Sequence, residues 1–221
     1  MTFSKEWDDR YSENTHMSNW PWSDLVSYVK RYTDIQSDSN VLELGCGSGA
    51  NIPFFLSLNA NYHGIDGSPT IIEKLKQKFP QLKNNLSVCD FTLELPYDKT
   101  FDLVVDRAAL TCNTTDGIKN CLDLIFDKLS PNGLFIGIDW YSTSYFEFNN
   151  GKNAGDKFSK TGFGDGNFAN TGIVHFSNKA HLEDLLEKFN IKILEHKIIK
   201  NFMNNKEDDF ASWNFIAQKK I

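Results

Sequence analysis

The residues best suited to chemistry lie in the stretch 40–55, where a carboxylate precedes three alternating glycines. Glu43 lies inside a short apolar run and is followed by Gly45, Gly47 and Gly49. A charge inside a buried strand is costly unless it is paired or used, so Glu43 is a candidate ligand-binding residue. Glycine allows a ligand to lie against the backbone, because a Cβ atom would collide with it. The alternative is an edge carboxylate that is solvated at the end of the strand.

The elements around this loop are predicted to be a strand and a helix. Residues 41–44 are apolar apart from Glu43, as in a strand that is buried on both faces. Residues 50–58 have a helical pattern with Pro53 in the first turn, where no backbone donor is needed. The helix N-terminus adds unpaired N–H groups that face a ligand. The loop alone suggests a dinucleotide site, but the usual pyrophosphate fingerprint has its third glycine one residue later.

Length and composition predict one soluble domain that comprises residues 1–221. The chain has 40% hydrophobic and 24% charged residues and a net charge of −6, which argues against a broad nucleic-acid surface. It has no apolar run of membrane-spanning length and no signal-peptide core, so we expect a cytoplasmic protein that does not contact a membrane. The four cysteines and five histidines have no metal-ligand spacing, so we expect no metal.

The pattern Glu-x-Gly-x-Gly-x-Gly resembles motif I of the class I (Rossmann-like) S-adenosylmethionine-dependent methyltransferases. The resemblance extends in motif order over residues 36–140. It implies that S-adenosylmethionine (SAM) is the cofactor, that S-adenosylhomocysteine (SAH) is the product, and that no metal takes part. It also implies that the loop contacts SAM through Glu43, Gly45, Cys46, Gly47 and Gly49.

Two further acidic residues follow predicted strands. The strand 62–65 ends at Asp66, which is 23 residues after Glu43. The resemblance assigns the ribose hydroxyls to Asp66, with Gly67 beside it, although an acidic residue here also suits a helix N-cap or a turn. The strand 86–89 ends at Asp90 and Phe91. The resemblance assigns the adenine amino group and ring to these two residues, although aspartate after a strand is also a common turn former.

The rest of the chain continues this alternation of strands and helices. A turn at 130–133 follows a predicted helix at 116–129, and a last helix runs from Leu182 to Phe189. The polar stretch 201–209 is too short for a crossover, so the two strands that it joins must be antiparallel. The later strands are expected at 101–105, 134–138, 191–199 and 210–217. The resemblance implies an α/β fold with a doubly wound, seven-stranded, mostly parallel sheet of order 3-2-1-4-5-7-6, strand 7 antiparallel, and helices on both faces.

Several polar residues could contact the methyl acceptor. Asp106 and Arg107 follow the fourth strand, which lies beside the cofactor's sulfur in this topology, and Asp139 and Trp140 follow the fifth. A hydroxyl acceptor needs a base, for which Asp106, also expected to contact the cofactor, ranks before His175. Asp106 and Arg107 are also compatible with a structural ion pair, and His175 with a hydrogen-bonded buried histidine.

Residues 1–35 are expected to form an N-terminal cap over the site. A helix is predicted to follow Asn19, which is a possible cap residue. Tyr11, His16 and Trp20 are candidates for substrate binding in this segment. The alternative is that the aromatic residues pack on the core and that His16 is solvated.

Residues 141–175 are predicted to be a lid-like insertion. The stretch 141–172 contains six glycines and five phenylalanines. A loop of more than about 15 residues in a compact domain is usually functional or disordered, and phenylalanines argue against disorder. The alternative to a substrate lid is an ordered surface elaboration without a catalytic role.

The leading hypothesis is transfer of a methyl group from SAM to an O or N atom of a small molecule, such as a sugar or a specialised metabolite. The expected state is a monomer or a homodimer with a small-molecule acceptor and no nucleic-acid partner. One alternative is a methyltransferase that acts on protein or RNA. Another is a SAM-binding partner subunit without activity, because an intact binding loop does not establish turnover.

Overall fold

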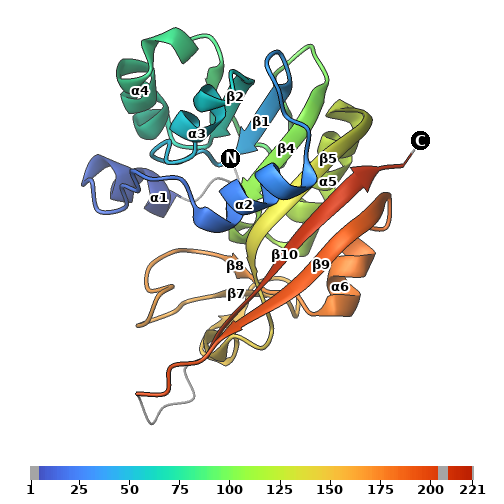
Figure 1. Cartoon of the computed structure of the whole chain (residues 1–221). Helices are drawn as coiled ribbons and strands as arrows, with labels where there is room; N and C mark the ends of the chain where they lie inside the picture. The colour runs from blue at the N-terminus through green and yellow to red at the C-terminus, as the bar shows by residue number, and fades with distance from the viewer. Residues whose placement is uncertain (1–4, 204–208, 221) are drawn as a thin grey trace.

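The computed structural model describes residues 5–203 and 209–220. Its centre is a seven-stranded sheet with the order β3-β2-β1-β4-β5-β10-β9, so the expected order is confirmed (Figure 1). β10 is antiparallel to both of its neighbours, and the other neighbouring strands are parallel. The strands are β1 (Asn40–Leu44), β2 (Asn61–Asp66), β3 (Leu86–Val88), β4 (Phe101–Arg107), β5 (Leu129–Tyr141), β9 (Phe189–Ile199) and β10 (Phe210–Lys219).

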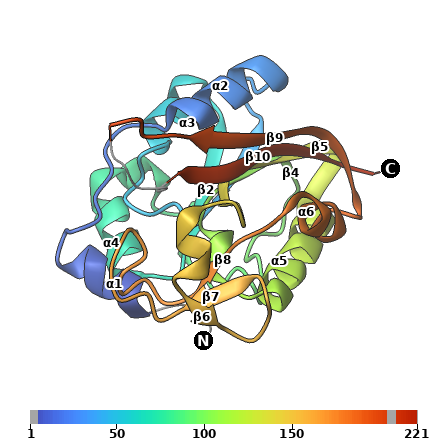
Figure 2. The ribbon, with the colours of Figure 1, turned by 90° about the horizontal axis from the view of Figure 1, so that it is seen from below.

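Helices cover both faces of this sheet (Figure 2). One apolar cluster joins one face to α2 (Ser23–Tyr32), α3 (Ile52–Ser57) and α4 (Pro69–Lys78), and another joins the opposite face to α5 (Thr115–Lys128) and α6 (Lys179–Leu185). In β1, Val41 belongs to the first cluster, and Leu42 and Leu44 belong to the second. Burial on both faces therefore explains why β1 is an apolar run without alternation.

Three element boundaries differ from the sequence expectations. α2 has Trp22 at its N-cap position with no side-chain cap, so the expected cap at Asn19 is wrong. Residues 130–133 were expected to be a turn before the strand, but they belong to β5 as a bulge: Leu129 and Leu134 pair with Phe101 and Leu103, so one residue of β4 lies opposite four of β5. The last helix, α6, ends before Phe189, which begins β9.

Helix α1 (Lys5–Ser12) was not anticipated, because its sequence is highly polar. It packs against α4 through hydrogen bonds. Asp8 accepts from the Ser68 hydroxyl and from the Thr70 backbone N–H, and Lys74 donates to the Tyr11 carbonyl at 2.6 Å. Polar contacts thus place α1 beside the start of α4.

The insertion is an ordered unit with its own small core. It contains the 3-10 turn η3 (Phe146–Asn149) and a three-stranded antiparallel sheet of β6 (Lys152–Asn153), β7 (Ser159–Thr161) and β8 (Val174–His175). Phe163, Phe168 and Phe176 are buried in an apolar cluster that also contains Ala211 of β10. Its phenylalanines therefore pack as expected, and the function of this unit as a lid stays a prediction.

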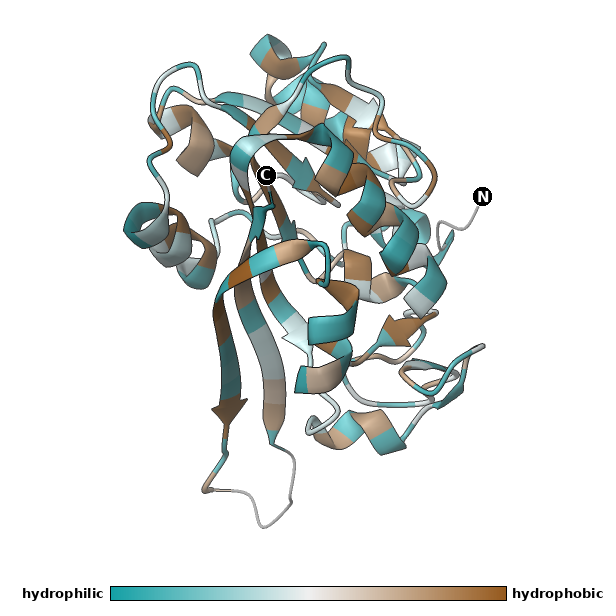
Figure 3. Ribbon diagram, turned by 90° about the vertical axis from the view of Figure 1, so that its right-hand side faces the viewer, coloured by the Kyte–Doolittle hydropathy of each residue, from teal (hydrophilic) through white to brown (hydrophobic). Residues whose placement is uncertain are grey.

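The strands β9 and β10 extend beyond the body of the molecule, and β9 ends in apolar residues (Figure 3). Ile198 and Ile199 are 49% and 54% exposed, and Phe202 and Met203 are almost fully exposed. Within residues 5–203 and 209–220, no helix has the length and apolarity that crossing a membrane requires.

Phe176 should be essential for the stability of the insertion. Its side chain is fully buried among aromatic rings, whereas Phe202 is 89% exposed and serves as the matched control. Phe176→Ala should lower the free energy of unfolding by about 3–5 kcal/mol, because it leaves a cavity in the core. Phe202→Ala should leave the free energy within about 0.5 kcal/mol. Urea denaturation measures both, and equal stability of the two variants would contradict this packing.

Candidate functional site

A cavity of about 400 Å³ lies at the carboxyl ends of β1, β2 and β4. Its wall includes the glycine loop, residues of α1 and residues of the insertion. Ligands of open α/β sheets bind at this edge, where the order of the strands reverses. The volume lies within the range of about 300–1,000 Å³ that is typical of small-molecule sites.

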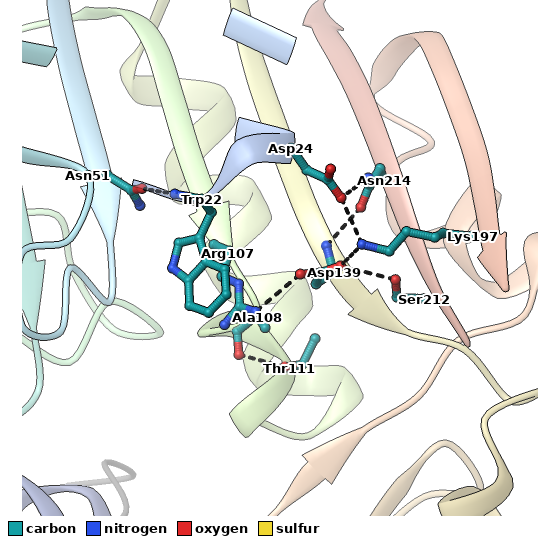
Figure 4. A network of polar contacts seen from close by, with 10 residues as sticks. All are labelled: Trp22, Asp24, Asn51, Arg107, Ala108, Thr111, Asp139, Lys197, Ser212 and Asn214. Carbon is teal, nitrogen blue, oxygen red and sulfur yellow. Dashed lines mark hydrogen bonds and ion pairs between the residues drawn. The ribbon is translucent and has the colours of Figure 1, made fainter. Parts of the chain in front are cut away.

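Glu43 lies in the wall of this cavity and is only 3% exposed, which contradicts the alternative of a solvated edge carboxylate. Asn51 Nδ2 donates to its Oε1 at 2.7 Å, and the Tyr62 hydroxyl donates to its Oε2 at 2.6 Å. Burial raises the pKa of Glu43 to about 7. The Trp22 N–H donates to Asn51 Oδ1 at 3.2 Å, so this carboxylate is connected to the start of α2 (Figure 4).

Asp66 lies at the end of β2 and also lines the cavity. The N–H of Gly47 donates to its Oδ2 at 3.0 Å, and the N–H of Ser68 donates to its Oδ1 at 2.9 Å. The N-cap of α4 is Ser68, so Asp66 is not the cap residue. Burial raises its pKa to about 6. Each carboxylate oxygen retains a lone pair for a further donor, such as a ligand hydroxyl.

Two of the three loop glycines are required by protein packing. All three have positive φ angles, which favour glycine. A Cβ atom at Gly45 would lie 2.2 Å from Cβ of Ala109, and one at Gly49 would lie 2.7 Å from Cδ2 of Leu75. The expectation that the glycines leave room for a ligand is therefore corrected at Gly45 and Gly49, where the protein itself occupies the space.

The N-terminal segment contributes two of its three predicted residues to the cavity. Tyr11 is buried, and its hydroxyl would lie 3.1 Å from a Cβ atom at Gly47, so α1 lies across the loop. His16 lines the cavity and makes an edge contact with Trp7, with 5.0 Å between ring centroids. Trp20 is 83% exposed and is not part of the cavity wall, which corrects its predicted substrate contact.

The remaining residues predicted for the cofactor lie around the same cavity. Cys46, Gly67, Asp90 and Phe91 all contribute to its wall. Asp90 Oδ1 accepts from the backbone and hydroxyl of Thr92 at 3.1 and 2.6 Å. The turn after β3 is thereby held in place, with the Phe91 ring beside it as a flat apolar surface.

The structure corrects the predicted roles of Asp106 and Trp140. Asp106 is fully buried and is not among the residues that line the cavity. Its Oδ1 accepts from the N–H groups of Ala109 and Leu110 at 3.1 and 3.0 Å, and its Oδ2 accepts from Trp140 Nε1 at 2.7 Å. Burial raises its pKa to about 7. Asp106 therefore supports the loop after β4, and Trp140 binds this carboxylate in place of a substrate.

His175 is also placed away from the cavity. It is 1% exposed, its Nδ1 lies 3.0 Å from the Ser159 hydroxyl, and its Nε2 lies 3.1 Å from Nε2 of His181. Burial lowers the pKa of His175 to about 3. The alternative of a hydrogen-bonded buried histidine describes these contacts, and the predicted catalytic role is corrected. Among the described residues, no group of three potential ligands could hold a metal.

Arg107 lines the cavity as predicted, and Asp139 holds it there. The guanidinium carbon lies 3.6 Å from the centroid of the Trp22 ring, and Nη2 donates to Asp139 Oδ2 at 3.1 Å (Figure 4). Lys197 binds the other oxygen of Asp139 at 2.5 Å. Asp139 is not part of the cavity wall, so its predicted substrate contact is corrected: it positions Arg107.

Most of the aromatic and polar residues that complete the wall were not predicted individually. They come from α1, from the N-cap of α2, from the end of β5, from the insertion and from β10, which are far apart in the chain. The only signal in the sequence was the density of aromatic residues in these segments. The residues are Trp7, Arg10, Trp22, Tyr141, Tyr145, Asn167, Phe168, Thr171, Val174 and Phe210.

Residues 42–135 match the family model described as "Methyltransferase domain". The chain is 27% identical over 120 residues to "O-methyltransferase 3" of Dictyostelium discoideum, which covers 48% of this chain and 28% of that protein. It is 24% identical to "Malonyl-[acyl-carrier protein] O-methyltransferase" of Bacillus anthracis, over 74% of this chain and 65% of that protein. The matches thus span less than two thirds of these curated relatives.

Solved structures share the fold at low sequence identity. A SAM-dependent methyltransferase of Methanosarcina mazei has a TM-score of 0.67 at 19% identity, over 91% of this chain and 99% of that chain. The N-methyltransferase NodS of Bradyrhizobium japonicum, solved with SAH, has a TM-score of 0.59 at 14% identity, over 96% and 87% of the two chains. The resemblance seen in the glycine loop is therefore confirmed at the level of the fold.

Asp106→Asn should be energetically coupled to Trp140, because its amide would place an N–H donor against the N–H of Trp140. At about pH 8, above the raised pKa of Asp106, this unpaired donor should cost about 1–3 kcal/mol of unfolding free energy, and removal of the buried charge should offset part of that cost. In a Trp140→Phe background the same substitution should cost less, since the opposing donor is gone. Urea denaturation of the four proteins measures this coupling, and additive effects would contradict the assigned support role.

Proposed function

We propose that this chain transfers a methyl group from SAM to an O or N atom of a small molecule. Its fold and the family match of residues 42–135 are those of a class I SAM-dependent methyltransferase. The observation that carries the proposal is the cavity at the strand ends, with Asp66 in its wall. Asp66 is fixed by two backbone N–H groups and keeps acceptor capacity for a ligand.

The residues present are suited to SAM. Asp66 would accept hydrogen bonds from the ribose hydroxyls, and Asp90 and Phe91 would contact the adenine. The backbone around Gly47 and the carboxyl of Glu43 would face the rest of the cofactor. This division follows from the order of strands, because β3, β2 and β1 are neighbours and present these residues along one edge.

SAM supplies a methyl group that is electrophilic because it is bonded to a sulfonium. The chain's own contribution is to orient the acceptor in line with that methyl group and to exclude water. These effects suffice for an amine or thiol nucleophile, whereas a hydroxyl acceptor also needs a base. His16 is the candidate for this base, because it lines the cavity. Burial lowers its pKa, as do the charges of Arg10 and Arg107, so the neutral imidazole that can accept a proton is favoured.

A small acceptor is favoured because the cavity is bounded by two segments that meet beside it. Nη2 of Arg10 in α1 donates to the carbonyl of Ala169 in the insertion at 2.7 Å. This contact supports the proposal that residues 141–175 form a lid. A methyltransferase for protein or RNA would need an open groove here, and the net charge of −6 gives no support to an RNA partner.

Transfer of label is the experiment that tests this proposal. The purified protein is incubated with SAM that carries a labelled methyl group and with a fractionated lysate of the source cell. Label in the small-molecule fraction is the expected result. Label in protein or RNA would favour the second class of acceptor, and binding of SAM without any transfer would favour a non-catalytic partner subunit.

Asp66→Asn tests the cofactor site separately from turnover. The loss of a carboxylate that accepts from the ribose should weaken SAH binding by about 1–3 kcal/mol in isothermal titration calorimetry. In the wild type, SAH affinity should fall as the pH is lowered through about 6, because protonation of Asp66 removes that acceptor. This component of the pH dependence should be absent from the variant. Unchanged affinity in a variant that thermal unfolding shows to be folded would contradict the ribose assignment.

A further inference from the structure

The charged residues of the cavity are separated by sign along the edge of the sheet. The acids of the described wall are Glu43, Asp66 and Asp90, which come from β1, from β2 and from the turn after β3. Arg107 is the last residue of β4, which neighbours β1 on the side opposite to β2. Among the described wall residues beyond β4, from β5, the insertion and β10, none is charged. The cavity therefore has an acidic half and a half whose charge comes from arginine.

Arg10 adds a second positive charge to the same cavity. It comes from α1, and its Nη2 donates to the uncharged carbonyl of Ala169 at 2.7 Å. His16 also lines the cavity, and burial, together with the charges of Arg10 and Arg107, lowers its pKa and so favours its neutral form. The arginines are thus the permanent charges outside the acidic half.

Arg107 is held rigidly but is not saturated with hydrogen bonds. Trp22 stacks on its guanidinium, and only Nη2 donates to Asp139. Its Nε is buried and has no hydrogen-bond partner among the described residues. A buried donor of this kind is costly when it is left unpaired, and guanidinium N–H groups match the oxygens of an anion. Asp139 is itself shared with Lys197, so Arg107 does not neutralise it alone.

The cavity wall beyond Arg107 is aromatic. Tyr141, Tyr145, Phe168 and Phe210 contribute to the wall, and the rings of Tyr141 and Phe168 meet edge to face with 4.7 Å between centroids. Aromatic rings of this kind pack best against another planar apolar group. The arginine-containing half of the cavity therefore combines a guanidinium with aromatic side chains against which a planar group can pack.

We propose that Arg107, stacked on Trp22 and held by Asp139, binds a negatively charged group on a planar acceptor. The proposal rests on the proposed function, because it divides one cavity into a cofactor half and an acceptor half. It narrows the acceptor from any small molecule to a planar anion, such as an aromatic carboxylate. Sugars without a charged group are excluded as the preferred acceptor.

The carboxylate of SAM itself is a competing partner for Arg107. The two cases are separated by comparing SAH with 5′-methylthioadenosine, which has the same nucleoside and lacks the amino-acid carboxylate. If Arg107 binds the cofactor, Arg107→Gln will weaken SAH binding and leave 5′-methylthioadenosine unchanged, and this result would overturn the proposal. The expected result is that both ligands bind the variant as they bind the wild type.

The acceptor half is tested with two probes of the same shape and different charge, naphthalene-2-carboxylate and naphthalene-2-carboxamide. Each is titrated into the full chain saturated with SAH, and binding is followed by calorimetry. The carboxylate should bind the wild type at least about tenfold more tightly than the amide, because hydrogen bonds to a charged group are the stronger ones. In Arg107→Gln the two affinities should become equal, and in Arg107→Lys part of the preference should return.

Arg31→Gln is the matched control. Arg31 also lies over an aromatic ring, that of Tyr32 at 5.1 Å, but it is exposed and is not part of the cavity wall. This variant should keep the full preference for the carboxylate. Binding of SAH by the wild type shows that the cofactor site is intact. If the wild type then binds the two probes equally, or binds neither, the proposal is overturned. If the wild type does not bind SAH, the proposed function itself is contradicted.

Discussion

Burial of carboxylates at the carboxyl edge of the sheet is the constraint on which the site depends. Glu43, Asp66, Asp106 and Asp139 are between 0 and 8% exposed. A buried carboxylate is tolerated only where donors surround it, so each one fixes the groups that donate to it. Asp106 fixes the loop after β4, Asp66 fixes the glycine loop, Glu43 fixes the start of α3 through Asn51, and Asp139 fixes Arg107.

These carboxylates divide into two functional classes. Glu43 and Asp66 line the cavity and keep acceptor capacity toward a ligand. Asp106 and Asp139 lie behind the wall and are directed at protein donors. The same chemical group therefore lies in the cavity wall in one place and supports the protein behind it in the other. The acidic half that would receive SAM and the arginine-containing half assigned to the acceptor both follow from this division.

Much of the fold could be predicted because its signals are local. The apolar run of β1, the glycine spacing and the short connection before β10 are properties of neighbouring residues, and the family resemblance implied the strand order that the structure confirms. Helix α1 escaped prediction because its partners lie in α4, such as Lys74, which donates to Tyr11 across 63 positions of the chain. The insertion core likewise joins Phe163, Phe176 and Ala211, which no local pattern connects.

The sheet, the glycine loop and the acidic residues after its strands could be recognised from neighbouring residues. Which of these acidic residues line the cavity depends on long-range packing. Asp66 and Asp106 look alike in the sequence, since each lies at the carboxyl end of a buried strand, but Asp106 accepts a hydrogen bond from the indole N–H of Trp140, 34 residues away. His175 is likewise removed from the cavity by its contact with His181. The physical reason is that a side chain's role depends on its hydrogen-bond partners, and long-range packing places those partners.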